Sequence, residues 1–373
     1  MERVQTEAER RVGMTADITE LPAGIMPDYR REIPPELRQR QGSWVWHELV
    51  RPGVLRHLGA DGGELFTVRI LLPPNGILSA PTLRQLAHWI RKYALTGRRT
   101  SRQGFEFVGV QPAVLGEMLA ELQAAGFPAG GTGNTLHQVK CCTSFIHCQN
   151  AAIDAPSIAQ VITDYFYDDF LHPELPAALK ISVSGCPNQC GGGVEADIGI
   201  MGRYESIPEV DEEGFLNANI DIGLLLSWCP TGAIQPRETA RGTLVTIDAG
   251  RCARCTSCVQ VAPEGIKLQQ RSYAAIAVGG HGGNSRYGSE MATVVWPRVT
   301  AQPLQYGQLL ERIAAIINYW RRVGIPGERL AACLQRTGWE EFLAGVGAEP
   351  FAEPGTGRRA VANKRKGIEA GQL

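Results

Sequence analysis

The pattern of hydrophobic and polar positions predicts a compact unit of strands and helices in the first third of the chain. Phe66, Val68 and Ile70 alternate with polar residues, the period of a half-buried strand. Later apolar positions recur at helical spacing. The predicted strand, helix, strand and helix cover residues 65–71, 83–93, 104–110 and 115–122. This order predicts an α+β half-domain over residues 43–126, with helices packed on one side of a sheet.

A second set of apolar segments surrounds the middle of the chain. Leu309, Ile313 and Ile317 share one stripe of a helix, which is typical of core packing. The predicted elements are a helix over 155–170, strands over 179–183, 196–200 and 273–280, and a helix that begins near residue 308. They predict an α+β domain in two parts, residues 127–203 and 273–345.

Residues 204–272 differ in composition from their surroundings. They open with the acidic run 209–213 and carry their own cysteines, so we expect a domain inserted between two strands. The chain ends also differ. Residues 1–42 are polar and interrupted by prolines, which predicts an arm. The basic tail 346–373 is expected to be a solvated end or to lie on a partner subunit.

Composition and charge exclude some classes of function. Of 373 residues, 44% are hydrophobic, and 37 Lys and Arg against 38 Asp and Glu give a net charge of -1. The global charge therefore indicates neither nucleic acid nor an anionic membrane surface as partner. No run approaches the roughly 18 to 20 apolar residues of a membrane span, and the charged start does not resemble a secretory signal. We expect a cytoplasmic protein.

A reducing compartment makes the ten cysteines candidate ligands rather than disulfides. Eight fall into spaced groups, and Cys141 and Cys333 are left over. Free cysteines can also be small buried hydrophobic residues. Their clustering favours ligands.

One cysteine group lies in the acidic insertion. Cys252, Cys255 and Cys258 have the spacing of a ferredoxin loop around a four-iron cluster. Ala262 stands where the bacterial ferredoxin run has a fourth cysteine for a second cluster, so one cluster is expected here. Cys229, in a Cys-Pro-Thr-Gly-Ala segment that resembles the distal ligand segment of ferredoxin domains, completes four ligands. Structural zinc is the alternative, but three thiols at this spacing fit zinc poorly.

The other group consists of two pairs. Cys142 and Cys148 lie six positions apart, and Cys186 and Cys190 four positions apart. If Pro187 begins a helix, the second pair faces one object. Three glycines follow Cys190 and would let the backbone approach a large cofactor. Four thiolates suit a cubane iron-sulfur cluster, with Cys141 as an alternative to Cys142.

This spacing is similar to the siroheme and iron-sulfur motif of sulfite and nitrite reductases. Residues 97–107 resemble the Arg-Leu-Thr-Thr-Arg-Gln strand of that family, with Arg99 in place of leucine, and residues 175–180 resemble its Leu-Pro-x-x-x-Lys segment. With a ferredoxin module inserted after the last motif, residues 42–345 resemble the beta subunits of dissimilatory sulfite reductases.

The resemblance implies cofactors and site residues. Cys142, Cys148, Cys186 and Cys190 would hold the cluster coupled to siroheme, and Cys190 would bridge to the haem iron. Because siroheme carries a ring of carboxylates, it needs basic residues around it. The candidates are Arg98, Arg102, Lys180 and Arg286, each of which has an alternative as a surface charge. His147 would donate to haem or substrate, or pack as a hydrogen-bonded residue. Ala178 stands where assimilatory relatives often have a lysine.

The implied activity is a six-electron interconversion of sulfite and sulfide at siroheme, fed through a second four-iron cluster. The implied assembly is alpha2-beta2 with a homologous alpha subunit and a small cysteine-bearing sulfur carrier, in which Arg98 and Arg102 could face the alpha subunit's haem. The direction of reaction stays open. Two alternatives are a non-catalytic iron-sulfur electron-transfer subunit and a siroheme nitrite reductase.

Overall fold

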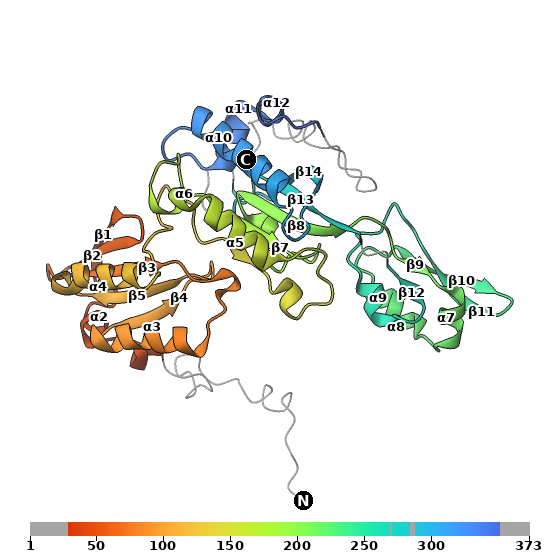
Figure 1. Cartoon of the computed structure of the whole chain (residues 1–373), viewed down its shortest axis with the longest axis horizontal. Coiled ribbons are helices and arrows are strands. Elements are labelled where there is room, and N and C mark those ends of the chain that lie inside the picture. The colour runs from red at the N-terminus through yellow and green to blue at the C-terminus, as the bar shows by residue number, and fades with distance from the viewer. Residues whose placement is uncertain (1–28, 269–270, 284–287, 351–373) are drawn as a thin grey trace, which may run out of the picture.

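The computed structural model describes residues 29–268, 271–283 and 288–350. Arg286, most of the predicted arm and most of the predicted tail lie outside these residues. Three hydrophobic cores form, one in the half-domain, one in the middle of the molecule and one in the insertion. Figure 1 shows them side by side along the long axis, with the middle unit between the other two.

The half-domain is a five-stranded sheet in the order β1-β2-β3-β5-β4, covered by two helices. Both helices carry proline in the first turn, where its missing N–H costs little. Trp89 and Phe107 are fully buried between helix and sheet. The elements are η1 (Tyr29–Glu32), α2 (Pro35–Gln39), β1 (Trp44–Arg51), β2 (Val54–Gly59), β3 (Glu64–Ile70), η2 (Pro74–Gly76), α3 (Ala80–Lys92), β4 (Thr96–Arg99), β5 (Phe105–Val110) and α4 (Pro112–Ala124).

The strands and helices predicted for this unit are confirmed, but the prediction did not include all of its strands. Strands β1 and β2 were missed because β1 exposes Val45 and Trp46, so its apolar residues follow no buried period. Residues 97–107 resemble a segment described as a strand in the family. They form the hairpin β4–β5, whose turn places Gln103 at a φ of 69°.

The middle unit is built on a second five-stranded sheet, in the order β14-β13-β8-β7-β6. β6, β7 and β8 run parallel, and β13 and β14 are antiparallel to their neighbours. Its elements are β6 (Lys140–Cys141), η3 (Ser144–Ile146), α5 (Ala155–Tyr165), α6 (Tyr167–Leu171), β7 (Ile181–Ser184), η4 (Gly193–Glu195), β8 (Ile198–Tyr204), β13 (Ser272–Val278), β14 (Thr293–Val299), α10 (Gly307–Val323), α11 (Leu330–Thr337) and α12 (Trp339–Val346). The helices and the sheet share one core. This mixture in both units confirms the predicted α+β class.

One predicted helix in this unit is interrupted, and one condition set for the cysteine pair is not met. The helix expected over 155–170 is interrupted at Phe166, which caps α5 with a non-helical ψ of 30°. No helix begins at Pro187. Residues 187–190 form turns, because Gln189 has a φ of 58° and cannot continue a right-handed helix.

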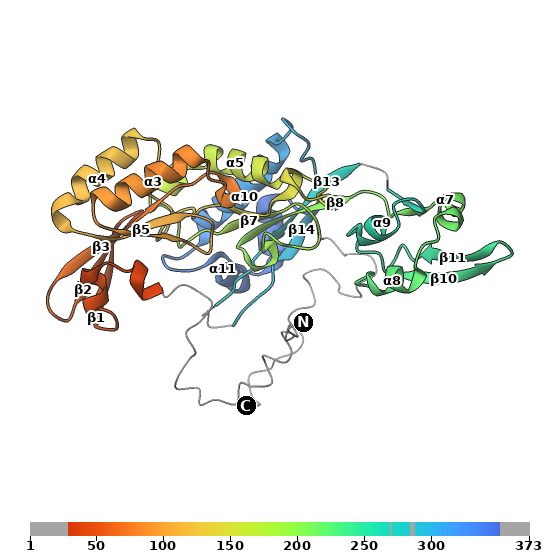
Figure 2. The ribbon, with the colours of Figure 1, turned by 90° about the horizontal axis from the view of Figure 1, so that it is seen from below.

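The insertion leaves and re-enters the sheet at one point. Tyr204, the last residue of β8, pairs with Ser272, the first residue of β13. Between them lie β9 (Glu209–Val210), α7 (Glu212–Asn217), α8 (Ile222–Ser227), β10 (Ile234–Thr239), β11 (Gly242–Ile247), α9 (Ser257–Val261) and β12 (Ile266–Lys267). Figure 2 shows these elements at the end of the molecule opposite the half-domain. Over all described segments, none of the helices combines the length and apolarity that a membrane span requires.

Candidate cofactor sites

Two parallel strand ends bring the first cysteine group together. β6 and β7 pair in parallel, with Cys141 opposite Val183. The backbone N–H of Cys142 continues the ladder by donating to the carbonyl of Val183, at 3.1 Å. Because the carboxyl ends of parallel strands meet at one edge of a sheet, Cys142 and Cys186, which follow these strands, lie close together.

Cys148 and Cys190 complete this group of thiols. Burial is the largest cause that raises the pKa of Cys186 to about 11, charge on Cys148, Cys142 and Cys190 contributes to the rise, and a backbone hydrogen bond at Asn188 opposes it. The four thiols therefore lie near enough to interact electrostatically. The N–H of Gly185 donates to Sγ of Cys142 at 3.0 Å, the kind of contact that stabilises a cluster ligand. Cys186 is buried, whereas Cys190 is exposed, so Cys190 lies nearer the surface than Cys186 does.

The glycines after Cys190 pack on the protein's own strand. A Cβ at Gly191 would lie 2.2 Å from the carbonyl oxygen of Val183. The N–H of Gly191 donates to Oγ of Ser184 at 3.1 Å. A Cβ at Gly192 would lie 2.9 Å from Nζ of Lys140, so this ammonium stands beside the cysteine loop. Lys140 was missed as a candidate, although its place two residues before Cys142 was a signal.

The cysteines of the insertion surround one small cavity. The lining of this cavity includes Cys229, Cys252, Cys255 and Cys258. Cys258 belongs to α9 and to the core of the insertion, and Cys229 follows α8. Ala262, where ferredoxins have a further cysteine, is fully buried in that core. The four predicted thiols therefore line one cavity, and position 262 belongs to the hydrophobic core beside it.

Backbone donors point at the sulfurs in this cavity. Sγ of Cys229 accepts from the N–H of Ala233 at 3.2 Å, and Sγ of Cys252 accepts from the N–H of Arg254 at 3.4 Å. Burial works to raise the pKa of Cys229, but such hydrogen bonds outweigh it and lower the pKa. Burial raises the pKa of Cys258 to about 12. Cys258 is therefore protonated as a free thiol and would release its proton on binding iron.

The spacing of the thiols bears on the kind of metal. Within the part of the chain that the structure describes, no three His, Cys, Asp or Glu side chains are placed to hold a single metal ion. A four-iron cluster has a different requirement, because each thiolate binds its own iron at a separate corner. Both groups of four neighbouring cysteines, with N–H groups aimed at their sulfurs, fit such clusters.

Arg102 and Gln103 connect the half-domain to the cysteine strands. Arg102 donates from Nε to the carbonyl of Gln138 at 3.0 Å and from Nη2 to the carbonyl of Ile181. Burial lowers the pKa of Arg102 to about 10, so it stays charged at neutral pH. Gln103 donates to the carbonyl of Cys141 at 2.7 Å and accepts from its N–H at 3.0 Å. This clamp was not predicted, since a glutamine in a turn carries no signal of its partner.

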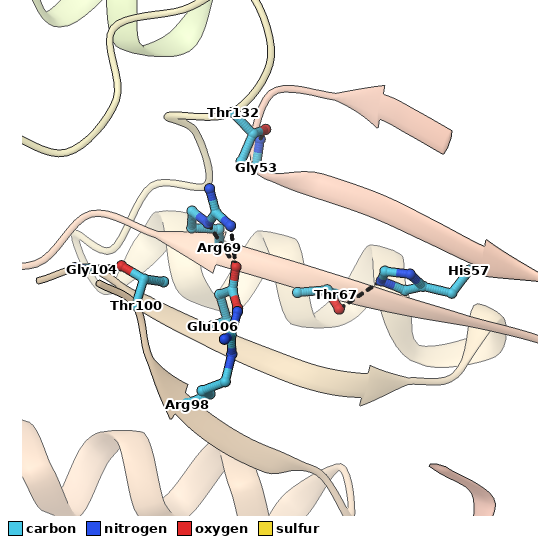
Figure 3. Close-up of polar contacts among 9 residues, drawn as sticks. All are labelled: Gly53, His57, Thr67, Arg69, Arg98, Thr100, Gly104, Glu106 and Thr132. Atoms are coloured by element: carbon cyan, nitrogen blue, oxygen red, sulfur yellow. Dashed lines mark hydrogen bonds and ion pairs between the residues drawn. The ribbon is translucent and has the colours of Figure 1, made fainter. Parts of the chain in front are cut away.

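Arg98 lies apart from the cysteines, on the sheet of the half-domain. Figure 3 shows Arg98 and Arg69 on opposite sides of Glu106, which is 2% exposed. Arg69 and Arg98 donate from Nε to Glu106 at 2.8 and 3.0 Å. Burial works to raise the pKa of Glu106, but the two arginines hold it below its usual range. Arg98 is therefore paired with a carboxylate of its own half-domain and not with a residue of the cysteine site.

Lys180 lies beside a buried ion pair. Its backbone N–H donates to Asp197 at 2.8 Å, and Asp197 pairs with Arg329 at 2.7 Å. Burial lowers the pKa of Lys180, and the nearby Arg329 and Arg102 lower it further, whereas Asp197 raises it. The structure thus brings Lys180 and Arg102 into one charged cluster and leaves Arg98 outside it.

The remaining candidates differ in exposure. His147 is exposed and caps η3 in the loop before Cys148. Cys141 is 1% exposed within the core of the middle unit, and burial raises its pKa to about 12. This placement favours Cys142 over Cys141 as a ligand. Cys333, on α11, is also buried in this core.

Two protein-family models match the chain. The nitrite and sulphite reductase 4Fe-4S domain matches residues 132–354. The nitrite/sulfite reductase ferredoxin-like half domain matches residues 57–125. The first match covers more than half of the chain and contains both cysteine groups.

Individual relatives agree with these matches. The beta subunit of dissimilatory-type sulfite reductase from Archaeoglobus fulgidus is 31% identical over 333 residues, 87% of this chain and 89% of the relative. The alpha subunit of that type from Allochromatium vinosum is 27% identical over 299 residues, 77% of this chain and 70% of the relative. A crystal structure of dissimilatory sulfite reductase I shares the fold, with a TM-score of 0.76 at 21% identity over 90% of this chain and 83% of that chain. The chain therefore belongs to the nitrite and sulfite reductase family, among the dissimilatory sulfite reductases, which confirms the family predicted from its motifs.

Proposed function

We propose that the chain is the beta subunit of a dissimilatory-type sulfite reductase, an oxidoreductase that interconverts sulfite and sulfide in a six-electron reaction. One observation carries the proposal: each predicted set of four cysteines is brought together, the first at the edge of β6 and β7 and the second around one cavity. Family membership supplies the chemistry that such sites serve.

The proposed cofactors are siroheme and two four-iron clusters. Cys142, Cys148, Cys186 and Cys190 would hold the cluster coupled to siroheme, with the exposed Cys190 as the bridge to the haem iron. Siroheme and this cluster would supply the electrons of the reaction. Cys229, Cys252, Cys255 and Cys258 would hold the second cluster and receive electrons singly.

The chain's own residues would position the cofactor and the anions. Lys140 stands beside Gly192 in the cysteine loop, where an ammonium attracts a carboxylate or an oxyanion. Lys180 lies in the charged cluster with Arg102 and Arg329, and a lowered pKa makes its ammonium a better proton donor. Arg98 and His147 stay candidates for a haem held by the alpha subunit, because neither is directed at this chain's cysteines by a described contact.

The proposed assembly is alpha2-beta2, with a small cysteine-bearing sulfur carrier as a further partner. The similarity of this chain to alpha subunits supports a pseudo-symmetric pairing of related chains. The domain boundaries at residues 42, 126, 203, 272 and 345 are likewise proposed, and the three separate cores support them. The same centre serves sulfite reduction or the reverse oxidation, since the driving potential belongs to the partners.

Paired substitutions test the ligand assignment. In protein purified with its native partner, Cys190→Ser is expected to abolish the coupled haem signal and to leave the second cluster intact. Cys255→Ser is expected to do the reverse. The measurements are iron, sulfide and tetrapyrrole content, visible absorbance and electron paramagnetic resonance.

Two outcomes would contradict the proposal. Unchanged spectra in both variants would show that the ligands are wrong. A wild-type protein with two clusters but without siroheme absorbance would instead be an electron-transfer subunit. Parallel assays with sulfite and nitrite distinguish a sulfite reductase from a nitrite reductase.

A further inference from the structure

The two cysteine groups are joined by a direct contact between their loops. Thr256 lies between Cys255 and Cys258 in the insertion, and Asn150 lies two residues after Cys148. The Thr256 hydroxyl donates to Oδ1 of Asn150 at 2.9 Å, across 106 residues of sequence. One hydrogen bond therefore links a ligand loop of one proposed cluster to a ligand loop of the other.

Thr256 is held tightly in place. Its φ of 65° lies in the left-handed region, which a β-branched residue rarely adopts. Its side chain and backbone together are only 5% exposed. A threonine in this conformation, with its hydroxyl paired across the domain boundary, points to a role for the hydroxyl.

The Asn150 loop is fixed on its other side. The N–H of Ala152 donates to the carbonyl of Gly185, the residue before Cys186, at 2.7 Å. The hydroxyl of Tyr204 donates to the carbonyl of Ala151 at 2.9 Å. The loop thus contacts the chain next to the first cysteine group and the strand end from which the insertion departs. The backbone that follows the acceptor Asn150 is therefore held by hydrogen bonds to two other segments.

The contact lies beside an open cavity rather than inside continuous packing. The cavity is lined by Phe145 and Gln149 from the Cys148 loop and by Val259 and Gln260 from α9. Because this cavity separates the two loops on one side of the contact, the hydroxyl to amide bond is one of the contacts that align them.

We infer that Thr256 is a positioning residue for electron transfer between the two centres, with Asn150 as its acceptor. The inference rests on the proposed function. In each step one electron leaves the reduced cluster of the insertion, which is oxidised by one electron, and the siroheme-coupled centre is reduced by one. No bond forms or breaks and no proton moves. A low-potential one-electron donor resupplies the insertion.

The test compares variants of the cofactor-loaded complex. Thr256→Val keeps the shape and removes the donor, and Thr256→Ser keeps the donor. After rapid mixing with reduced methyl viologen, freeze-quench electron paramagnetic resonance follows each centre. We expect Thr256→Val to slow reduction of the siroheme-coupled centre by about tenfold or more, the size typical for loss of an outer-shell partner of a metal site. Thr256→Ser should stay near wild type.

Matched variants exclude a general effect on the insertion. Thr239 donates to the carbonyl of Gly242 in the β10–β11 hairpin, away from the contact. Thr239→Val should leave the transfer rate unchanged. Asn150→Leu removes the acceptor from outside the ferredoxin-type loop and should reproduce the defect even if Thr256→Val fails to assemble its cluster. Because both changes remove one bond, the double variant should be no slower than either single variant.

Specific results would overturn the inference. A wild-type rate in Thr256→Val with full cluster content would do so, as would an equal defect in Thr239→Val or a defect in Thr256→Ser. Failure of the proposed function looks different, because wild-type protein would then lack siroheme or one cluster by content and spectrum. In that case, faster amide hydrogen exchange at Ala151 and Ala152 in Thr256→Val than in Thr239→Val would still support the positioning contact, and equal exchange would overturn it.

Discussion

The two cysteine sites differ in the length of chain from which their residues come. The insertion takes its thiols from residues 229–258, around a cavity backed by a small core of its own. The site at the edge of β6 and β7 depends on two strands, a glycine loop packed on β7 and a clamp from the half-domain. The site in the insertion is local and should tolerate substitutions elsewhere in the molecule. The site at β6 and β7 is assembled from distant segments and should not tolerate them.

The largest effect is expected for Gly191→Ala. The added Cβ would meet the carbonyl oxygen of Val183 at 2.2 Å, and a backbone atom cannot move aside as a flexible side chain can. We expect a loss of about 3 kcal/mol in the free energy of unfolding and loss of the coupled centre, with the cluster of the insertion retained. Denaturant unfolding and cofactor content check both parts.

A matched glycine tests whether the clash is the cause. Gly116, within α4, has open space where a Cβ would stand. Gly116→Ala should keep both centres and stabilise the fold by up to about 1 kcal/mol, because alanine suits a helix better than glycine. Loss of both clusters in Gly191→Ala would contradict the independence of the two sites.

A smaller effect is expected for Arg102→Met. The change removes the charged donors that bind the carbonyls of Gln138 and Ile181. A hydrogen bond that involves a charged group contributes about 1.5 to 3 kcal/mol to stability. The free energy of unfolding should fall by roughly that amount, and binding of siroheme should weaken more than loading of the insertion. Titration of the apoprotein with siroheme and chemical denaturation measure the two effects.

The control is an arginine on the insertion. Arg241 is exposed in the β10–β11 turn, so Arg241→Met should change stability by no more than about 0.5 kcal/mol. If Arg102→Met and Arg241→Met gave the same siroheme affinity, the half-domain clamp would not support the assembled site.

The smallest effect concerns pH. Burial lowers the pKa of His57, His47 lowers it further, and Glu106 opposes this. The unfolded chain therefore binds a proton more readily than the folded one, so stability is complete above the unfolded pKa, about 6.5, and falls as pH drops below it. His57→Gln should flatten the decline in melting temperature between pH 7 and lower pH. An unchanged pH profile would exclude His57 as a contributor.

Much of the fold could be predicted because it follows from local patterns. Alternation over β3 and the stripe of α10 have a period that burial of one face dictates. The cysteine spacing was equally readable, because short loops around a cluster fix the intervals between ligands. Strand β1 was not predicted because its exposed apolar residues follow no period. The turn at Gln189 was not predicted because a residue other than glycine in the left-handed region leaves no clear signal in the sequence.

The sequence by itself determined the family, the alternation of strands and helices, and the cysteine spacing on which the proposed ligands rest. Only the tertiary structure decided where the charged candidates act. Arg98 and Arg102 lie four positions apart in one matched segment, yet a hairpin sends Arg98 to Glu106 and Arg102 to the cysteine strands. The parallel pairing of β6 and β7 likewise joins Cys142 to Cys186, and Thr256 reaches Asn150 across the insertion. The physical reason is range: spacing encodes contacts within a loop or turn, while contacts between distant segments depend on how sheets pair and cores pack.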